Sequence, residues 1–264
     1  MKRLAAVLIG LSGFLVAGCF DIEQTLTLER NMSGKAGFTM KIDMEPMIFF
    51  MTQMKRDMEG KKGEPTKAEL DAARAEFLAQ NKPKGGDDFE KDKKEMESKL
   101  PKGVTLIDAK FLDQGLKATV NLLFGFDNAS KLATIKFPKK ADAWKKADTG
   151  TTPTPTDSPV DAPFDGLNIA DDGKTILITS KVNNPMADET AKTPVPPDAD
   201  TMKQIEKMFG NLRVAYKITA PFEILEHNAT RKEGNTLIWE YGVKTLQSMK
   251  PEQMKQGVRV RYKK

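Results

Sequence analysis

Residues 21–44 read DIEQTLTLERNMSGKAGFTMKIDM and alternate apolar with polar side chains on both sides of one short turn. Such alternation has the period of a β-strand with one buried and one exposed face. Between the two alternating runs, Asn31 and Gly34 belong to a segment of turn residues. We therefore predict an antiparallel β-hairpin over residues 21–44. Its inward side chains are expected to be Ile22, Gln24, Leu26 and Leu28 in the first strand and Phe38, Met40, Ile42 and Met44 in the second.

The segment before this hairpin has the composition of a secretory signal. Lys2 and Arg3 are followed by an uncharged apolar run over residues 4–16. An apolar run of about 13 residues is shorter than the roughly 17 to 25 that a membrane-spanning helix needs. The run leads to Gly18 and Cys19, which resemble the cleavage site of a bacterial lipoprotein signal. This resemblance implies removal of residues 1–18 after Gly18 and acylation of Cys19, palmitate included. The alternative is an ordinary signal peptide with an incidental cysteine.

Residues 45–100 interrupt the β pattern and are predicted to form a helical insertion. Pro46 suits a first helical position, where proline is favoured. The methionines that follow recur at intervals of four, three and four residues, which places them along one face of a helix. Flexible thioether side chains suit either a packed core or an adaptable binding groove. The candidate apolar contact surface consists of Met47, Phe50, Met51, Met54 and Met58.

The rest of the insertion is mostly polar. Thr66 and Glu69 fit a capping box at the start of a second helix, which carries only a thin apolar stripe. Gly85 and Gly86 interrupt this helical pattern. Charged residues then dominate residues 88–100, which predicts a charged, solvated helical arm.

The strand period returns after residue 103 and recurs to the end of the chain. We predict hairpins within residues 104–126 and 167–180, strands on both sides of a turn at Gly234 and Asn235, and a last strand over 258–262. Asn128 is a candidate cap for a short helix. A further short helix is predicted over residues 202–209. Residues 147–163 and 183–200 are poor in large apolar groups and rich in proline, which predicts loops.

Together these patterns predict an α+β fold. Several antiparallel β-hairpins form a sheet with helices packed on one face, and a charged helical arm and a disordered Pro/Thr loop are added to it. We divide the chain into the signal peptide 1–18, an N-terminal region 19–146 with the insertion 45–100, a linker 147–163 and a C-terminal β-rich region 164–264. The C-terminal region is expected to continue the same domain.

The C-terminal strands carry a second resemblance. A strand runs into a proline, a second strand follows, and a Gly-Asn turn then leads to a tryptophan. With the acylated cysteine and a Ser-Gly hairpin turn, this order is similar to the LppM-type lipoprotein domain family of bacteria. The resemblance implies an exported, lipid-anchored α+β domain that interacts with envelope glycolipids or partner proteins and has no assigned catalytic residue. The matching residues are Cys19, Ser33, Gly34, Pro221, Gly234, Asn235 and Trp239.

The sequence offers little for catalysis. His227 is the only histidine and Cys19 the only cysteine, which excludes the usual zinc ligand sets and a Cys–His pair. We therefore predict no catalytic or metal-binding residue. Two alternatives stay open. The first is a hydrolase that cleaves an envelope polymer with paired carboxylates, as in glycoside hydrolysis. The second is a Cu(I)-binding protein, because the thioethers of the methionine stripe suit Cu(I).

Composition and charge indicate the class of protein. The 264 residues carry a formal net charge of +5, and 30% of them are charged against 39% hydrophobic, which suits a well solvated exported protein. Basic residues interleaved with aromatic ones, as in single-strand nucleic-acid binding, are absent. We expect a non-enzymatic envelope lipoprotein without cofactor, held at the membrane by its N-terminal lipid, that binds an envelope lipid or another envelope protein but no nucleic acid. Phe20 follows Cys19 where an aspartate signals inner-membrane retention, which favours the outer membrane if the source is Gram-negative.

Overall fold

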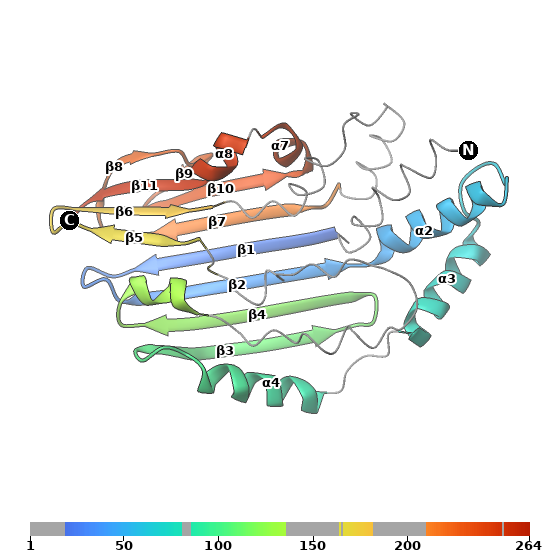
Figure 1. The fold of residues 1–264 in the computed structure, drawn as a ribbon, viewed down its shortest axis with the longest axis horizontal. Coiled ribbons are helices and arrows are strands. Elements are labelled where there is room, and N and C mark those ends of the chain that lie inside the picture. The colour runs from blue at the N-terminus through green and yellow to red at the C-terminus, as the bar shows by residue number, and fades with distance from the viewer. Residues whose placement is uncertain (1–18, 81–85, 136–163, 165, 182–209, 250) are drawn as a thin grey trace.

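The computed structural model describes residues 19–80, 86–135, 164, 166–181, 210–249 and 251–264 (Figure 1). Within these residues the chain forms two β-sheets and several helices, so the predicted α+β class is confirmed. The predicted signal segment 1–18, the loops 147–163 and 183–200 and the helix over 202–209 lie outside the described residues.

The first hairpin forms as predicted. β1 (Cys19–Leu28) and β2 (Gly34–Asp43) pair antiparallel along their whole length, with Ile22 opposite Met40. In the turn, the Glu29 backbone N–H donates to the Ser33 carbonyl at 2.8 Å, and Asn31 Oδ1 accepts from the Ser33 N–H at 3.0 Å. The turn residues that identify the hairpin in the sequence are therefore the residues that close it.

Strands from both halves of the chain extend this hairpin into a seven-stranded sheet. The added strands are β3 (Val104–Asp113), β4 (Lys117–Phe126), β7 (Arg213–Thr219), β9 (Arg231–Glu233) and β10 (Thr236–Gly242). The order is β3-β4-β2-β1-β7-β10-β9. Neighbours are antiparallel except β1 and β7, which run parallel, with Asp21 opposite Arg213. This parallel pair, which the sequence does not predict, joins the N-terminal and C-terminal regions in one sheet.

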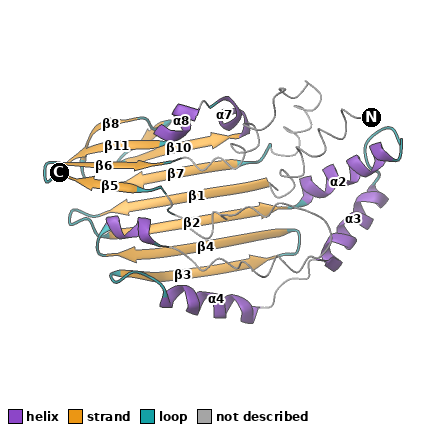
Figure 2. Ribbon diagram, in the orientation of Figure 1, coloured by secondary structure: helices purple, strands orange, loops and turns teal. Residues whose placement is uncertain are grey.

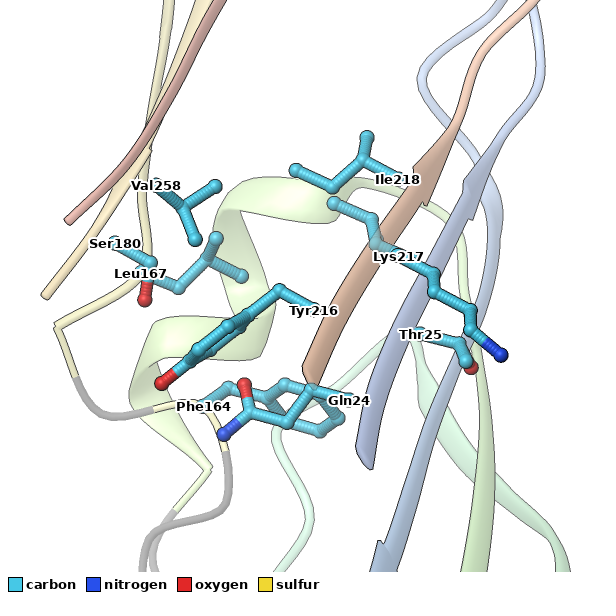
Figure 3. A pocket seen from close by; sticks show the side chains of 10 residues that line it. Gln24, Thr25, Phe164, Leu167, Ser180, Tyr216, Lys217, Ile218 and Val258 are labelled. Atoms are coloured by element: carbon cyan, nitrogen blue, oxygen red, sulfur yellow. The ribbon is translucent and has the colours of Figure 1, made fainter. Parts of the chain in front are cut away.

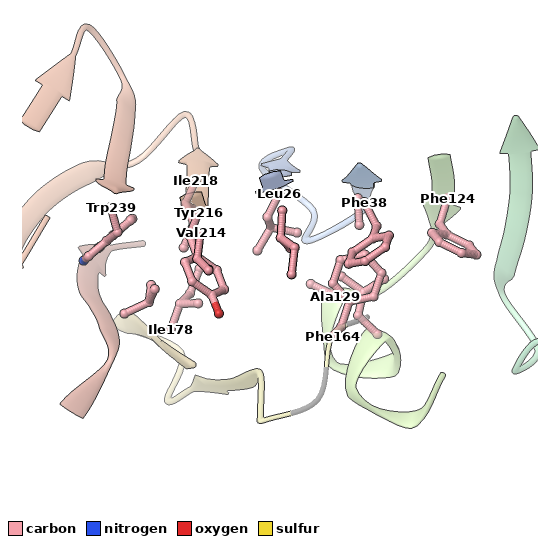
Figure 4. Close-up of a cluster of buried hydrophobic side chains, with 14 of the residues drawn as sticks. Leu26, Phe38, Phe124, Ala129, Phe164, Ile178, Val214, Tyr216, Ile218 and Trp239 are labelled. Atoms are coloured by element: carbon pink, nitrogen blue, oxygen red, sulfur yellow. The ribbon is translucent and has the colours of Figure 1, made fainter. Parts of the chain in front are cut away.

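A second sheet covers part of the inner face of the first. It contains β5 (Asn168–Asp171), β6 (Thr175–Ser180), β8 (Glu223–His227) and β11 (Val258–Lys263), in the order β5-β6-β11-β8. Apolar side chains fill the core, and Trp239, Phe38 and Phe124 are fully buried in it (Figure 4). The 3-10 helix η2 (Ala129–Thr134) adds the buried Leu132 to this core. Two short helices, α7 (Val243–Ser248) and α8 (Pro251–Gln256), connect β10 to β11.

The outer face of the larger sheet carries an ionic network centred on Arg213. Its guanidinium donates to Asp21 at 2.8 Å, to Glu23 at 3.1 Å and to Glu240 at 2.9 Å. Lys217 also donates to Glu23, at 3.0 Å. Burial alone would raise the pKa of Glu23, but the hydrogen bonds from Lys217 and Arg213 outweigh it and lower that pKa. The network therefore joins β1, β7 and β10 on the face opposite the core.

The predicted insertion contains three helices, α2 (Glu45–Met58), α3 (Lys67–Gln80) and α4 (Gly86–Ser98) (Figure 2). α4 is the expected charged helix, and it contacts the edge strand β3, where the ring of Phe89 stacks on Phe111 with centroids 5.7 Å apart. In the part of the chain that the structure describes, no helix combines the length and the hydropathy needed to span a bilayer.

Asn228 connects the two sheets at the point where the chain passes from β8 to β9. Its Oδ1 accepts from Trp239 Nε1 at 2.7 Å and from the Arg259 backbone N–H at 2.8 Å. Its Nδ2 donates to the Gly257 carbonyl at 2.8 Å. Trp239 lies on β10 of the larger sheet and Arg259 on β11 of the smaller one. One amide side chain therefore ties both sheets together.

We expect Asn228→Ala to destabilise the fold by about 2 kcal/mol, because the buried indole N–H of Trp239 loses its acceptor. Urea denaturation of residues 19–264 measures this loss. Asn235→Ala, in the exposed β9–β10 turn, is the matched control and should change stability by less than about 0.5 kcal/mol. Equal effects of the two substitutions would contradict the role assigned to Asn228.

Candidate functional site

The candidate site lies at the end of the larger sheet where β1 begins and β2 ends. Cys19, the first residue of β1, is paired with Asp43, the last residue of β2. Figure 1 shows this end of the two strands next to α2. α2 begins only two residues later, and Asp43 Oδ1 accepts from the Glu45 backbone N–H at 3.0 Å. Pro46 stands in the first turn of this helix, as its sequence position predicts. The Met44 N–H donates to the Leu116 carbonyl at 2.9 Å, which fixes the start of α2 to the β3–β4 turn.

The capping box at the start of α3 is confirmed. Glu69 accepts from the Thr66 backbone N–H at 2.8 Å, and the Thr66 hydroxyl accepts from the Glu69 N–H at 3.3 Å. These backbone and hydroxyl hydrogen bonds from Thr66, followed by the contribution of Arg56, lower the pKa of Glu69 from 4.5 to about 2. The side chain is therefore ionised at neutral pH.

Two arginine–carboxylate pairs hold α2 and α3 together. Arg56 of α2 donates to both carboxylate oxygens of Glu69 at 2.7 and 2.6 Å. Arg74 of α3 donates from Nε to both oxygens of Glu45 at 3.1 and 2.9 Å. α3 also meets the sheet, because Leu78 lies so close to Gly115 in the β3–β4 turn that a Cβ at Gly115 would be 2.8 Å from Leu78 Cδ2. The two helices thus form a hairpin docked on the sheet end.

A groove of about 600 Å³ lies between the two helices, and its volume is within the range of small-molecule sites. The apolar side chains of α3 that face it are Ala72, Ala73 and Phe77. From α2, Ile48 and Thr52 are buried, whereas Met51 and Met58 are 44% and 66% exposed. The remaining apolar lining comes from Met47 and Met54, both partly buried. We call this feature the methionine groove.

The structure divides the predicted contact surface into two environments. Met47, Met51, Met54 and Met58 all line the methionine groove. Phe50 is not part of that lining; it is 7% exposed and belongs to the buried core cluster. Of Cys19 the structure gives the backbone position at the head of β1. Gly18 lies outside the described residues.

Charges around the methionine groove balance. Lys55, Arg56 and Lys61 line it together with Glu59, Glu69 and Glu76. Lys61 pairs with Glu59 at 2.7 Å, and Arg56 pairs with Glu69 as described above. Because each sign is present three times, the lining has no net formal charge. The lining therefore has no excess of either sign that would favour an anion or a cation.

A second cavity lies between the two sheets but is far smaller. Its volume is about 20 Å³, and Gln24, Ser180, Tyr216 and Phe164 are among the residues that line it (Figure 3). One water molecule needs roughly 10 to 15 Å³ by this measure. The space between the sheets therefore accommodates about one water, so the methionine groove is the better candidate for a ligand.

His227 and the described carboxylates lie at or near the surface. His227 is exposed on β8, and its Nδ1 accepts from the Ala229 backbone N–H at 3.2 Å. In the described ranges no aspartate or glutamate is buried, and no three His, Cys, Asp or Glu side chains gather as a metal site would require. No observation in this part of the chain therefore favours the paired-carboxylate alternative.

α3 forms the second wall of the methionine groove, which the sequence pattern does not predict. Periodicity identifies a thin apolar stripe on this helix but does not show that the stripe faces the methionines. The signal that could have found it is the charge pattern, because Glu45 and Arg56 on α2 have partners of opposite sign in Arg74 and Glu69 on α3.

Comparisons with known proteins find likenesses among solved structures. No protein-family model matches this chain. No curated protein matches it either. The chain is similar to the folded domain of the Mycobacterium tuberculosis protein LppM, solved by NMR, with a TM-score of 0.40 and 8% sequence identity. That match covers 93% of this chain and 89% of the LppM domain chain. The family resemblance carried by Pro221 and Trp239 stays a prediction.

We expect Met51→Glu to leave the fold intact, with a loss below about 1 kcal/mol, because this side chain is 44% exposed. Phe50→Glu, one residue away on the same helix, should cost more than about 3 kcal/mol, because it removes a buried ring and buries a carboxylate. Urea denaturation of both variants measures the difference. Unfolding of Met51→Glu would show that the methionine face is core and not groove.

The lowered pKa of Glu69 predicts a pH dependence of the helical hairpin. Because the pKa is lower in the folded state, the ionised carboxylate adds stability that is complete above pH 4.5 and is lost as the pH falls toward about 2. Thermal melts followed by helical circular dichroism should give a higher melting temperature for the wild type than for Glu69→Gln at neutral pH. The difference between the two melting temperatures should narrow between pH 4.5 and 2. A difference in melting temperature that does not change with pH would show that the ionised Glu69 carboxylate is not the source of this stability.

Proposed function

We propose that this chain is a non-enzymatic, lipid-anchored lipoprotein of the bacterial cell envelope whose methionine groove binds an acyl chain of an envelope lipid. The anchor is acylated Cys19, exposed by cleavage after Gly18, and the outer membrane is its place if the source is Gram-negative. The proposal includes no cofactor, no metal and no nucleic-acid partner.

The observation that carries this proposal is the methionine groove itself. Its volume of about 600 Å³ is within the range of small-molecule sites, and its lining combines four unbranched thioether side chains with Phe77 and two alanines. Methionine adapts its shape to irregular apolar ligands at little cost. The balanced charge of the lining supports an uncharged hydrocarbon chain as the bound group.

Blocking the groove tests the proposal. Ala73→Trp places a bulky ring on a lining residue of α3, whereas Ala75→Trp places the same ring on an exposed residue of the same helix that does not line the groove. Native mass spectrometry of the gently purified mature chain should detect a copurifying lipid on wild type and on Ala75→Trp. Occupancy of Ala73→Trp should fall at least tenfold.

The outcomes distinguish a lipid bound in the groove from a protein partner. Equal lipid occupancy in both tryptophan variants would place the lipid outside the groove. A clean apoprotein mass for wild type would overturn acyl-chain binding and favour another envelope protein as the partner.

The anchor is tested independently. Cys19→Ser should release the protein from the membrane fraction and abolish incorporation of labelled palmitate. Stable attachment needs two or more acyl chains, and this substitution removes the residue proposed to carry them. A protein that stays in the membrane fraction after this substitution would disprove the lipoprotein signal.

Cu(I) binding is the second candidate, because Met47, Met51 and Met54 line the same groove and thioethers are soft ligands. A spectroscopic titration with Cu(I) decides it. Affinity weaker than micromolar would remove this alternative, and tighter binding that displaces the copurifying lipid would replace acyl-chain binding by copper handling.

A further inference from the structure

The attachment residue and the methionine groove lie at the same end of the molecule. Cys19 and Asp43 are paired neighbours, and α2 starts at Glu45, directly after that pair. The chain terminus Lys264 lies at the opposite end, where its backbone N–H donates to the Lys174 carbonyl in the β5–β6 turn at 2.9 Å (Figure 1). A protein attached through Cys19 therefore has its α2–α3 hairpin at the membrane end and its C-terminus at the far end.

The membrane end also carries exposed apolar side chains on the groove itself. Met51 and Met58, at 44% and 66% exposure, are large apolar groups that both line the groove and reach solvent. The other strongly exposed apolar side chains among the described residues lie on β3 and β8, outside the helical hairpin. The charge balance around the groove means that its approach to a lipid surface is not opposed by a local excess of either sign.

We infer that the methionine groove is loaded directly from the leaflet that holds the anchor, with the α2–α3 hairpin as the surface that touches this leaflet. The occupant is an acyl chain of a lipid in that same leaflet. This inference rests on the proposed function, since it requires both acylation of Cys19 and acyl-chain binding in the groove.

The physical reason for direct loading is the cost of exposing hydrocarbon to water. An acyl chain that crosses an aqueous gap exposes every methylene on the way, and the cost grows with chain length. Attachment at Cys19 removes this gap and also makes the encounter with the leaflet intramolecular, which raises the effective lipid concentration at the groove.

Attachment of the protein by either end tests the inference. Because Cys19 is the only cysteine, the mature chain can be coupled through its thiol to vesicles of phosphatidylcholine that contain a maleimide lipid. The double variant Cys19→Ser, Lys264→Cys attaches the same chain by its far end. Cys19→Ser, Lys174→Cys is a second far-end variant, on an exposed turn residue. The vesicles also contain phosphatidylcholine with a photoreactive acyl chain, and mass spectrometry locates the crosslinks.

Attachment through Cys19 should give at least tenfold more crosslinks to residues 47–58 and 72–80 than either far-end variant at equal surface density. Ala73→Trp coupled through Cys19 should lose the crosslinks inside the groove, while Ala75→Trp keeps them. This pair distinguishes loading of the groove from simple contact of the hairpin with the bilayer.

Failure of leaflet loading and failure of acyl-chain binding give different results. Equal crosslinking in both orientations, or crosslinking only after the lipid is dispersed in detergent, overturns loading from the anchor leaflet and leaves acyl-chain binding intact. No crosslinks to the groove on vesicles or in detergent overturns the proposed function as well.

Discussion

The parallel pairing of β1 with β7 is the constraint on which the rest of the structure depends. It places the strand that starts at Cys19 in the middle of the larger sheet, between β2 and β7. The pairing is supported on both faces, because Ile22 lies opposite Val214 on the core side and Asp21 binds Arg213 on the outer side. Strands from the N-terminal and C-terminal regions therefore share one core, and β8 and β11 of the smaller sheet are brought over it by the same C-terminal segment.

The position of β1 also determines where the methionine groove can form. Antiparallel pairing with β1 makes β2 end beside Cys19, and the chain must leave the sheet at that point. Pro46 favours a helix there, and the arginine pairs at Glu45 and Glu69 keep the returning helix close. The groove is thus assembled from surface helices held by polar contacts, while the tightly packed core between the sheets leaves room for about one water.

Local patterns predicted much of this structure, and long-range pairings were the part they missed. The hairpins within residues 21–44, 104–126 and 167–180 could be predicted because strand alternation and turn residues are adjacent in sequence. The division into two sheets, the parallel pair and the bridging role of Asn228 depend on residues far apart in the chain, which periodicity does not relate. Methionine spacing predicted one wall of the groove. It did not distinguish Phe50 from the methionines that line the groove, although Phe50 lies at the margin of the stripe and belongs to the core.

The same central pairing makes folding depend on the whole chain. Asp21 and its partner Arg213 are 192 residues apart in sequence, and closing so long a loop before its contacts form slows folding. Until β7 arrives, β1 has one unpaired edge, which is a template for association with other chains. A fragment that ends before β7, as after early termination of synthesis, keeps that open edge. Such a fragment therefore lacks β7, β9 and β10 of the larger sheet and presents a strand edge to which other chains can pair.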